Sequence, residues 1–247
     1  EVFSMERSLL ILFGTFFLVI GIVLFPIIRR KFRRKQLLNR PFPEEWKNLI
    51  NKNVPLYRKL PEKYKPELDG LINVFIDEKN FEGCAGLEIN DEIKLTIAAQ
   101  ACLLLIGKET SYFPTLTTIL VYPSVYFADN YRLIGRQGIH ELSARLGESW
   151  TGGSVILAWD HIKNKTFNYH NGHNVVLHEF AHQLDQEDGT ANGFPFLPDK
   201  ASYTEWFNIL SSEYKRLKDE LENGISDAID PYGATNPAEF FAVITET

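Results

Sequence analysis

Cysteine and methionine are scarce in this chain of 247 residues, which has two cysteines, Cys84 and Cys102, and one methionine, Met5. Neither cysteine has a second one at the spacing of a metal-ligand pair, so a disulfide scaffold and a thiolate metal site are both excluded. Two isolated cysteines instead fit a reducing compartment. Internal repeats and low-complexity segments are also lacking, which leaves an ordinary globular chain as the expectation.

Charge is absent from one long stretch near the N-terminus. Leu9 to Ile28 has 20 residues, of which 16 are Leu, Ile, Val or Phe. A helix of that length spans a hydrocarbon core of ~30 Å at ~1.5 Å per residue. Residues 9–28 are therefore predicted to form a transmembrane helix. A basic cluster follows within residues 29–35, and the positive-inside rule then places the rest of the chain in the cytoplasm of a bacterium, behind a single-pass anchor in the inner membrane.

Positive charge is concentrated before residue 37. The whole chain carries a formal charge of −6, whereas its first 36 residues hold seven basic and two acidic side chains, so the remainder carries −11. An acidic domain is poorly suited to nucleic acid, and we expect no direct nucleic acid binding. The basic cluster is expected to meet anionic lipid head groups.

The chain after the anchor divides into two parts. Residues 29–66 are rich in charge and proline and are predicted to be a basic juxtamembrane segment and linker. Residues 67–247 are predicted to form one compact domain. We expect translation to begin at Met5 and the natural chain to continue beyond Thr247.

One pentapeptide carries chemistry. Residues 178–182 read His-Glu-Phe-Ala-His, and two histidines four apart project from the same face of a helix. Both imidazoles can therefore bind one metal ion, with Glu179 placed to act on a water molecule at that ion. Val175, Val176 and Leu184 flank the motif, so this helix can lie in the interior, where buried polar groups require partners. The pattern predicts His178 and His182 as ligands of a catalytic Zn²⁺, one per chain.

A catalytic zinc ion usually has a third protein ligand, and two candidates follow the motif. Asp188 has the spacing of a metzincin-type ligand, but that geometry needs a glycine where the chain has Asp185. Glu239 follows Pro237, which suits the first turn of a helix, and apolar residues come after it. Glu239 also has the spacing of a capping residue relative to Asn236. We favour Glu239 as the third ligand, with Glu246 on the same face as a supporting or competing acid.

Periodic patterns place the remaining elements. The apolar periodicity predicts three helices, over Leu68–Lys79, Asp91–Ile106 and Tyr203–Leu221, and Asn90 is the predicted cap of the second. In the third helix, the side chains predicted to face the core are Trp206, Phe207, Leu210, Tyr214, Leu217 and Leu221. Thr117–Tyr122 and Ser154–Trp159 are predicted strands. The second strand precedes the motif helix, as a substrate-binding edge strand would, although a plain core strand fits equally well. His161, His170 and His173 are taken as loop histidines with no metal role.

Several separate blocks resemble the Mlc titration factor A family of zinc-dependent peptidases, over roughly residues 40–247. They are the His178 motif, Asn236–Ala242, Gly83–Ile89, Leu120–Ser124 and Glu148–Trp150. The catalytic domain of that family is similar to the one in anthrax lethal factor, a zincin whose third ligand is a glutamate. The resemblance thus implies an α+β, zincin-like metallopeptidase domain of the gluzincin type, behind the N-terminal helix.

The resemblance also implies roles for individual residues. His178, His182 and Glu239 would be the zinc ligands, Glu179 the general base, and Tyr232 the residue that steadies the oxyanion. A peptide or protein would be the substrate, and aminopeptidase and endopeptidase action both remain open. The predicted transmembrane helix over residues 9–28 departs from the family, because the best-known member of the family is a soluble cytosolic protein.

A second function is compatible with the same resemblance. The family name reflects the sequestering of a sugar-responsive transcriptional repressor, so the chain could be a regulatory binding protein with a latent or structural metal site. A membrane scaffold with a decayed site is a weaker alternative, because drift would have spoiled at least one of the five site residues.

Overall fold

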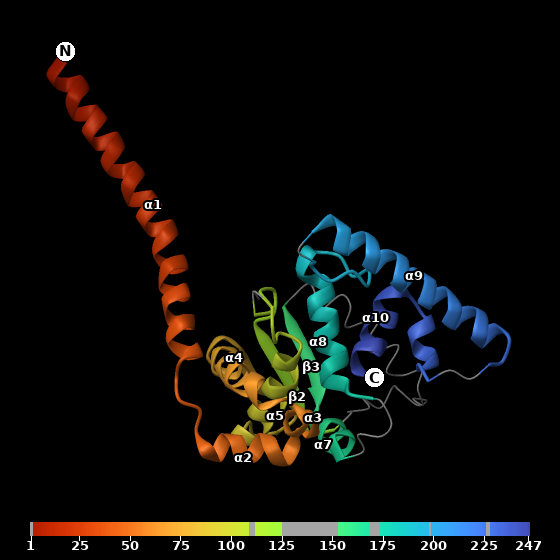
Figure 1. The fold of residues 1–247 in the computed structure, drawn as a ribbon. Helices are drawn as coiled ribbons and strands as arrows, with labels where there is room; N and C mark the ends of the chain where they lie inside the picture. The colour runs from red at the N-terminus through yellow and green to blue at the C-terminus, as the bar shows by residue number, and fades with distance from the viewer. Residues whose placement is uncertain (1, 109–111, 125–152, 168–172, 198, 226–227) are drawn as a thin grey trace. The chain divides into compact units, whose positions relative to one another are not determined.

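The computed structural model of the protein describes residues 2–108, 112–124, 153–167, 173–197, 199–225 and 228–247 (Figure 1). The chain forms two compact units, residues 1–41 and residues 42–247. Two features of the sequence analysis, the Glu148–Trp150 block and His170, lie outside the described residues.

The first unit is one long helix, α1 (Val2–Leu38), with Pro26 inside it. Within Leu12–Leu38 it is long and apolar enough to cross a bilayer by length and composition, with a mean hydropathy of 2.3 in its most apolar stretch. Its large apolar side chains are exposed, among them Phe16 and Phe25. The predicted apolar helix is thus present, and its insertion into a membrane stays a prediction.

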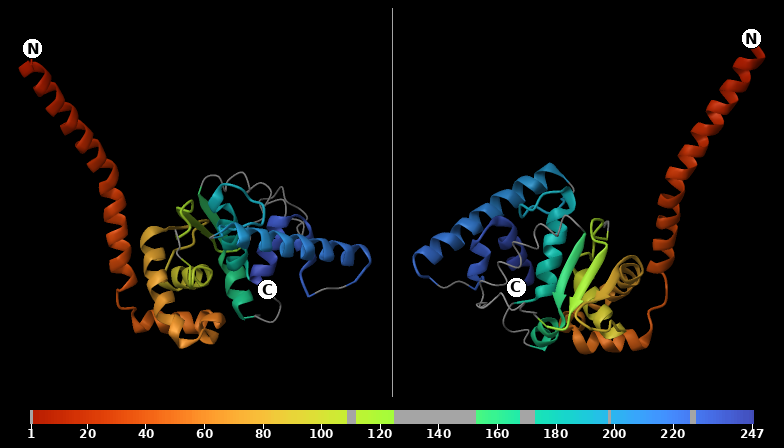
Figure 2. Two further views of the ribbon diagram at one scale, coloured as in Figure 1. Left: turned by 45° about the horizontal axis from the view of Figure 1, so that its top comes forward. Right: turned by 180° about the vertical axis from the view of Figure 1, so that it is seen from behind.

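The second unit combines many helices with a small sheet (Figures 1 and 2). Its elements, in chain order, are α2 (Glu44–Asn53), α3 (Pro55–Lys59), η1 (Glu62–Tyr64), α4 (Lys65–Glu78), β1 (Asn80–Gly83), α5 (Asp91–Leu103), β2 (Thr118–Tyr122), β3 (Ser154–Ala158), α7 (Trp159–Phe167), α8 (Val175–Asp185), η3 (Gln186–Asp188), α9 (Lys200–Glu222), η4 (Pro231–Ala234) and α10 (Pro237–Glu246).

The sheet has three parallel strands in the order β1-β2-β3. Ile119 pairs with Val155 and Val121 with Leu157, and all four side chains are buried. Their neighbours along each strand are only partly buried, as the alternation of a pleated strand requires. Within the described ranges, β3 pairs with β2 alone, and binding of a peptide along β3 remains a prediction.

The predicted helices and strands of this unit are confirmed, with boundary shifts of a few residues. Asn90 caps α5, since its side chain accepts a hydrogen bond from the backbone N–H of Ile93 at 3.0 Å. Residues Leu95 to Cys102 of α5 are all buried, because α2, α4 and α8 contact the helix from different sides. A helix surrounded in this way forms the centre of the unit.

An aromatic cluster fixes α8 in the core. Phe180 lies 4.9 Å from Phe113 and 5.6 Å from Phe75, between ring centroids, and all three rings have no exposed surface. Both figures show α8 between the sheet and α10. The motif helix is therefore held from one side by this cluster while its other side faces α10.

The predicted core stripe of α9 is wrong at one position. Leu210 and Leu217 are buried, whereas Phe207 is 55% exposed and stacks on Phe194 with ring centroids 5.5 Å apart. In the part of the chain that the structure describes, helix α9 packs mainly against α10 and η4. Its buried stripe is consequently narrower than the apolar pattern of the sequence.

We expect Phe180→Ala to lower the free energy of unfolding by about 3–5 kcal/mol, because it opens a cavity inside a close-packed cluster. Phe207→Ala removes a ring that is already largely solvated and is expected to cost less than about 1 kcal/mol. Chemical denaturation of the full chain in detergent micelles, followed by near-UV circular dichroism, measures both. If the two variants lost equal amounts of unfolding free energy, this would contradict the assignment of Phe180 to the core and of Phe207 to the surface.

Candidate metal centre

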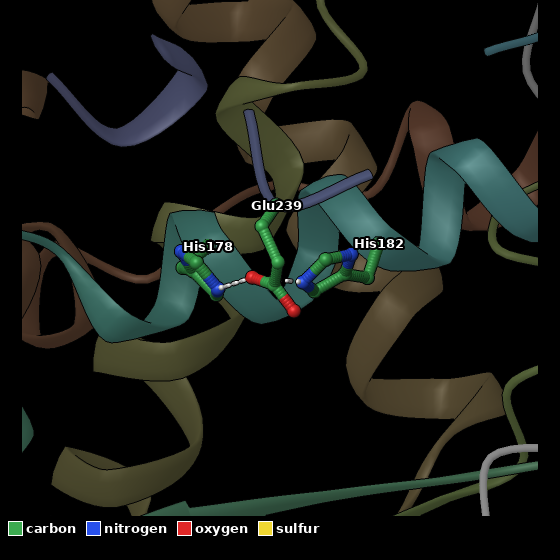
Figure 3. Close-up of side chains that lie close together, drawn as sticks. All are labelled: His178, His182 and Glu239. Atoms are coloured by element: carbon green, nitrogen blue, oxygen red, sulfur yellow. Dashed lines mark hydrogen bonds and ion pairs between the residues drawn. The ribbon is translucent and has the colours of Figure 1, made fainter. Parts of the chain in front are cut away.

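Helix α8 presents two imidazoles on one face. His178 and His182 are one turn apart, and their ring centroids lie 4.9 Å from each other (Figure 3). The helix begins at a defined point because the Asn174 side chain accepts hydrogen bonds from the N–H groups of Val176 and Leu177, each at 3.1 Å. This cap fixes the phase of the helix, and with it the direction in which the two histidines project.

Helix α10 brings a carboxylate to the same point. Glu239 Oε2 lies 3.2 Å from His178 Nε2 and 3.3 Å from His182 Nε2, and Figure 3 shows the carboxylate between the two rings. The predicted capping contact is present as well, because the Asn236 side chain accepts a hydrogen bond from the Glu239 N–H at 2.9 Å. The cap uses the backbone of Glu239, so its side chain is available for the histidines.

Small residues allow the two helices to approach closely. Ala181 on α8 packs in one buried cluster with Phe241 and Ala242 on α10, and neither alanine has any exposed surface. Trp206 of α9 closes this cluster from outside, with its ring 5.8 Å from that of Phe241. A larger side chain in place of either alanine would push α10 outward and move Glu239 away from the imidazoles.

Two of the converging groups, His178 and Glu239, have strongly shifted pKa values. Burial alone would lower the pKa of His178, but hydrogen bonds to Glu239 and Glu246 and the nearby charge of Glu179 raise that pKa to about 10. Burial would raise the pKa of Glu239, and its contacts with the two histidines instead hold it far below its usual range. The site therefore has a strong preference for a positive charge beside Glu239, which a proton or a metal cation can supply.

Two further residues, Glu179 and Tyr232, lie next to His178 and His182. Burial raises the pKa of the Glu179 carboxyl group, and the adjacent His178 and His182 oppose that rise. A carboxyl group with a raised pKa is better matched to proton transfer near neutral pH. Tyr232, on η4, has its ring 6.0 Å from that of His178 between centroids. Both residues thus lie next to the histidine pair, on two different segments of the chain.

The metzincin alternative does not fit the geometry. Helix α8 continues without a turn to Asp185, whose side chain has no exposed surface. Asp188 is exposed, and its carboxylate accepts hydrogen bonds from the backbone and hydroxyl of Thr190 at 2.9 and 2.7 Å. Asp188 is therefore engaged in a local turn and lies outside the group formed by the two histidines and Glu239.

Sequence reasoning gave no role to two residues beside the site. His173 Nε2 lies 3.2 Å from Asp230 Oδ2, and His173 Nδ1 lies 3.8 Å from Glu246 Oε1. A loop histidine has no periodic signal, and its partners come from segments distant in the sequence, so nothing local identifies it. His161, the other histidine taken as a loop residue within the described part, lies on α7.

The three side chains could together hold one metal ion. The ligand atoms of His178, His182 and Glu239 all lie within 4.8 Å of one another, and no other group of three His, Cys, Asp or Glu side chains in the described ranges is as close. Two imidazole nitrogens and one carboxylate oxygen suit zinc, whereas magnesium and calcium prefer oxygen ligands throughout. Three protein ligands also leave a fourth position for water or substrate.

Comparisons with known proteins agree with this geometry. A family model described as glucose-regulated metallo-peptidase M90 matches residues 29–247. A protein of Synechocystis sp. with no described function is 43% identical over 218 residues, which cover 87% of this chain and 79% of the relative. Mlc titration factor A of Salmonella arizonae is 30% identical over 203 residues, covering 78% and 77% of the two chains.

A third relative, Mlc titration factor A of Escherichia coli O1:K1, is 29% identical over 209 residues, which cover 81% of this chain and 76% of the relative. The match to the family model extends over both α8 and α10, the two helices that bring the histidines and Glu239 together. The chain therefore belongs to the Mlc titration factor A family, the glucose-regulated metallo-peptidases M90.

Proposed function

We propose that the protein is a zinc-dependent peptidase whose metal ligands are His178, His182 and Glu239. The observation that carries this proposal is the convergence of three ligand atoms within 4.8 Å on two different helices. Membership of a metallopeptidase family supports it independently. The domain of residues 67–247 would then be a zincin-like domain of the gluzincin type, in which a downstream glutamate completes the histidine pair.

Zinc, when bound, would act as a Lewis acid and lower the pKa of a water molecule towards ~7. Glu179 takes the proton from the attacking water and passes it to the leaving amine. Tyr232 donates a hydrogen bond from its hydroxyl group to the oxyanion that develops on the scissile carbonyl. The raised pKa of Glu179 and the short distance between the Tyr232 and His178 rings support these two roles.

The proposed location of the reaction rests on the composition and length of the first unit. Helix α1 anchors the chain in a bacterial inner membrane, and the basic residues within 29–35 hold the following domain on the cytoplasmic side. The substrate is then a cytoplasmic peptide or protein. The lack of charge over residues 9–28 and the length of α1 support this placement.

A regulatory role is the second candidate, and the name of the relatives favours it. Mlc titration factor A is named for an effect on Mlc, and this chain could likewise bind a transcriptional repressor with its metal site latent or structural. The two functions are separated by measuring zinc content together with hydrolysis of short chromogenic peptides, with and without a chelator. Bound zinc without turnover under any condition would favour the binding protein.

We expect Glu179→Gln to keep the metal and to lower kcat by about 10²–10⁴-fold, because an amide cannot accept the proton from water. The chromogenic peptide assay measures the rate, and elemental analysis of the same sample measures the zinc. Full activity in a zinc-loaded Glu179→Gln protein would contradict the assigned base.

Glu239→Ala is expected to reduce zinc below one ion per chain after dialysis, because it removes one of three ligands. Asp188→Ala is the matched control, since it removes the other candidate acid at an exposed position outside the ligand group. We expect this control to retain zinc at the wild-type stoichiometry. Loss of zinc from Asp188→Ala but not from Glu239→Ala would reverse the assignment.

A further inference from the structure

Glu246 is a second carboxylate on α10, and the proposed chemistry does not use it. It lies two turns after Glu239 on the same face of the helix, and its side chain is only 8% exposed. A carboxylate that is almost fully buried must have partners, because its desolvation is costly. Within the described ranges, its partners come from the N-terminal part of α8 and the residues just before it.

One backbone N–H group and two imidazole nitrogens lie near this carboxylate. Glu246 Oε2 accepts a hydrogen bond from the backbone N–H of Asn174 at 2.9 Å. Glu246 Oε1 lies 3.4 Å from His178 Nδ1 and 3.8 Å from His173 Nδ1. The carboxylate thus connects the end of α10 to the residue that caps α8 and to the first histidine of the motif.

The two nitrogens of His178 face two different acids. Nε2 points to Glu239 at 3.2 Å, and Nδ1 points to Glu246 at 3.4 Å. Since the ring nitrogens of an imidazole point in divergent directions, Glu246 cannot reach an ion that is held by Nε2 of the same ring. This geometry excludes Glu246 as a competing ligand for that ion and leaves it an orienting role.

We propose that Glu246 is a positioning residue, which accepts the Nδ1–H of His178 and thereby turns the Nε2 lone pair of that ring towards the metal. The proposal rests on the zinc site proposed above. An imidazole with a proton on Nδ1 has its free lone pair on Nε2, so the carboxylate selects the tautomer that can bind metal. Its hydrogen bond to Asn174 at the same time fixes the start of α8.

The carboxylate also has a connection to Tyr232. His173 Nε2 lies 3.2 Å from Asp230 Oδ2, and Asp230 Oδ1 accepts a hydrogen bond from the Tyr232 N–H at 2.8 Å. His173 therefore lies between Glu246 and the segment that carries Tyr232. Glu246 thus lies near His178 on one side and near His173 on the other, and His173 is followed by Asp230 and Tyr232.

Glu246→Gln tests this role. A carboxylate accepts hydrogen bonds through both oxygens, but a carboxamide has one acceptor oxygen, so the variant leaves either His178 or Asn174 facing an NH₂ group. We expect the zinc dissociation constant of the full chain in micelles, measured by competition with a chromogenic chelator, to rise about 10–100-fold. We also expect the slowly exchanging Nδ1 proton of zinc-bound His178, observed by NMR with ¹⁵N-labelled histidine, to be lost.

Two control variants separate orientation from general loosening. Glu213→Gln removes an exposed acid of α9 that pairs with Arg216, and we expect no change in zinc affinity. His173→Ala removes the more distant neighbour of Glu246 and is expected to keep zinc affinity within about threefold of the wild type. If His173→Ala lowered zinc affinity as much as Glu246→Gln does, this would contradict the proposal that Glu246 acts through its own contact with His178.

The remaining outcomes distinguish this inference from the proposed function. Tight zinc binding by both the wild type and Glu246→Gln, within threefold of each other, would overturn the role of Glu246 and leave the zinc site intact. A wild-type protein that binds no zinc would overturn the proposed function, and this inference with it. Zinc binding without peptide hydrolysis would leave the affinity test of Glu246 fully valid.

Discussion

The contact between Glu239 and the two histidines is the constraint on which the rest of the site depends. One carboxylate oxygen lies 3.2 and 3.3 Å from two imidazole nitrogens that belong to another helix. This arrangement requires α10 to lie very close to α8, and the buried pair Ala181 and Ala242 makes that possible. The packing of small residues and the polar cluster are therefore two aspects of one interface between helices.

The position of α8 is fixed by polar contacts at its start and by aromatic packing along its length. The Asn174 side chain caps the helix and donates a hydrogen bond to Gln100 on α5 at 2.7 Å, and Gln100 is itself buried. The backbone N–H of the same asparagine is bound by Glu246. Phe180 then anchors the middle of the helix among Phe75 and Phe113. Such a rigid support suits a site whose ligands must keep their geometry.

Local patterns in the sequence predicted the parts of this site that follow from helix geometry. Two histidines four residues apart must share a face of α8, and Asn236 with Pro237 marks the start of α10. The approach of Glu239 to the histidines is a contact between distant segments, and only the family resemblance and the need for a third ligand pointed to it. No local signal in the sequence indicated that Phe207 is exposed or that His173 lies next to Asp230. Both features depend on how whole elements pack against one another.

Two independent observations support a metal-dependent function. Membership of a metallopeptidase family and a convergent His, His, Glu group both point to metal-dependent hydrolysis. The peptidase and the repressor-binding protein proposed above would differ in the molecule that they recognise.

The most direct test of the central claim is X-ray absorption spectroscopy at the zinc edge on the zinc-loaded full chain. The account predicts a first shell of nitrogen and oxygen at about 2.0–2.2 Å, with the multiple-scattering pattern of two imidazoles. A first shell that contains sulfur at about 2.3 Å, or one without imidazole scattering, would contradict it.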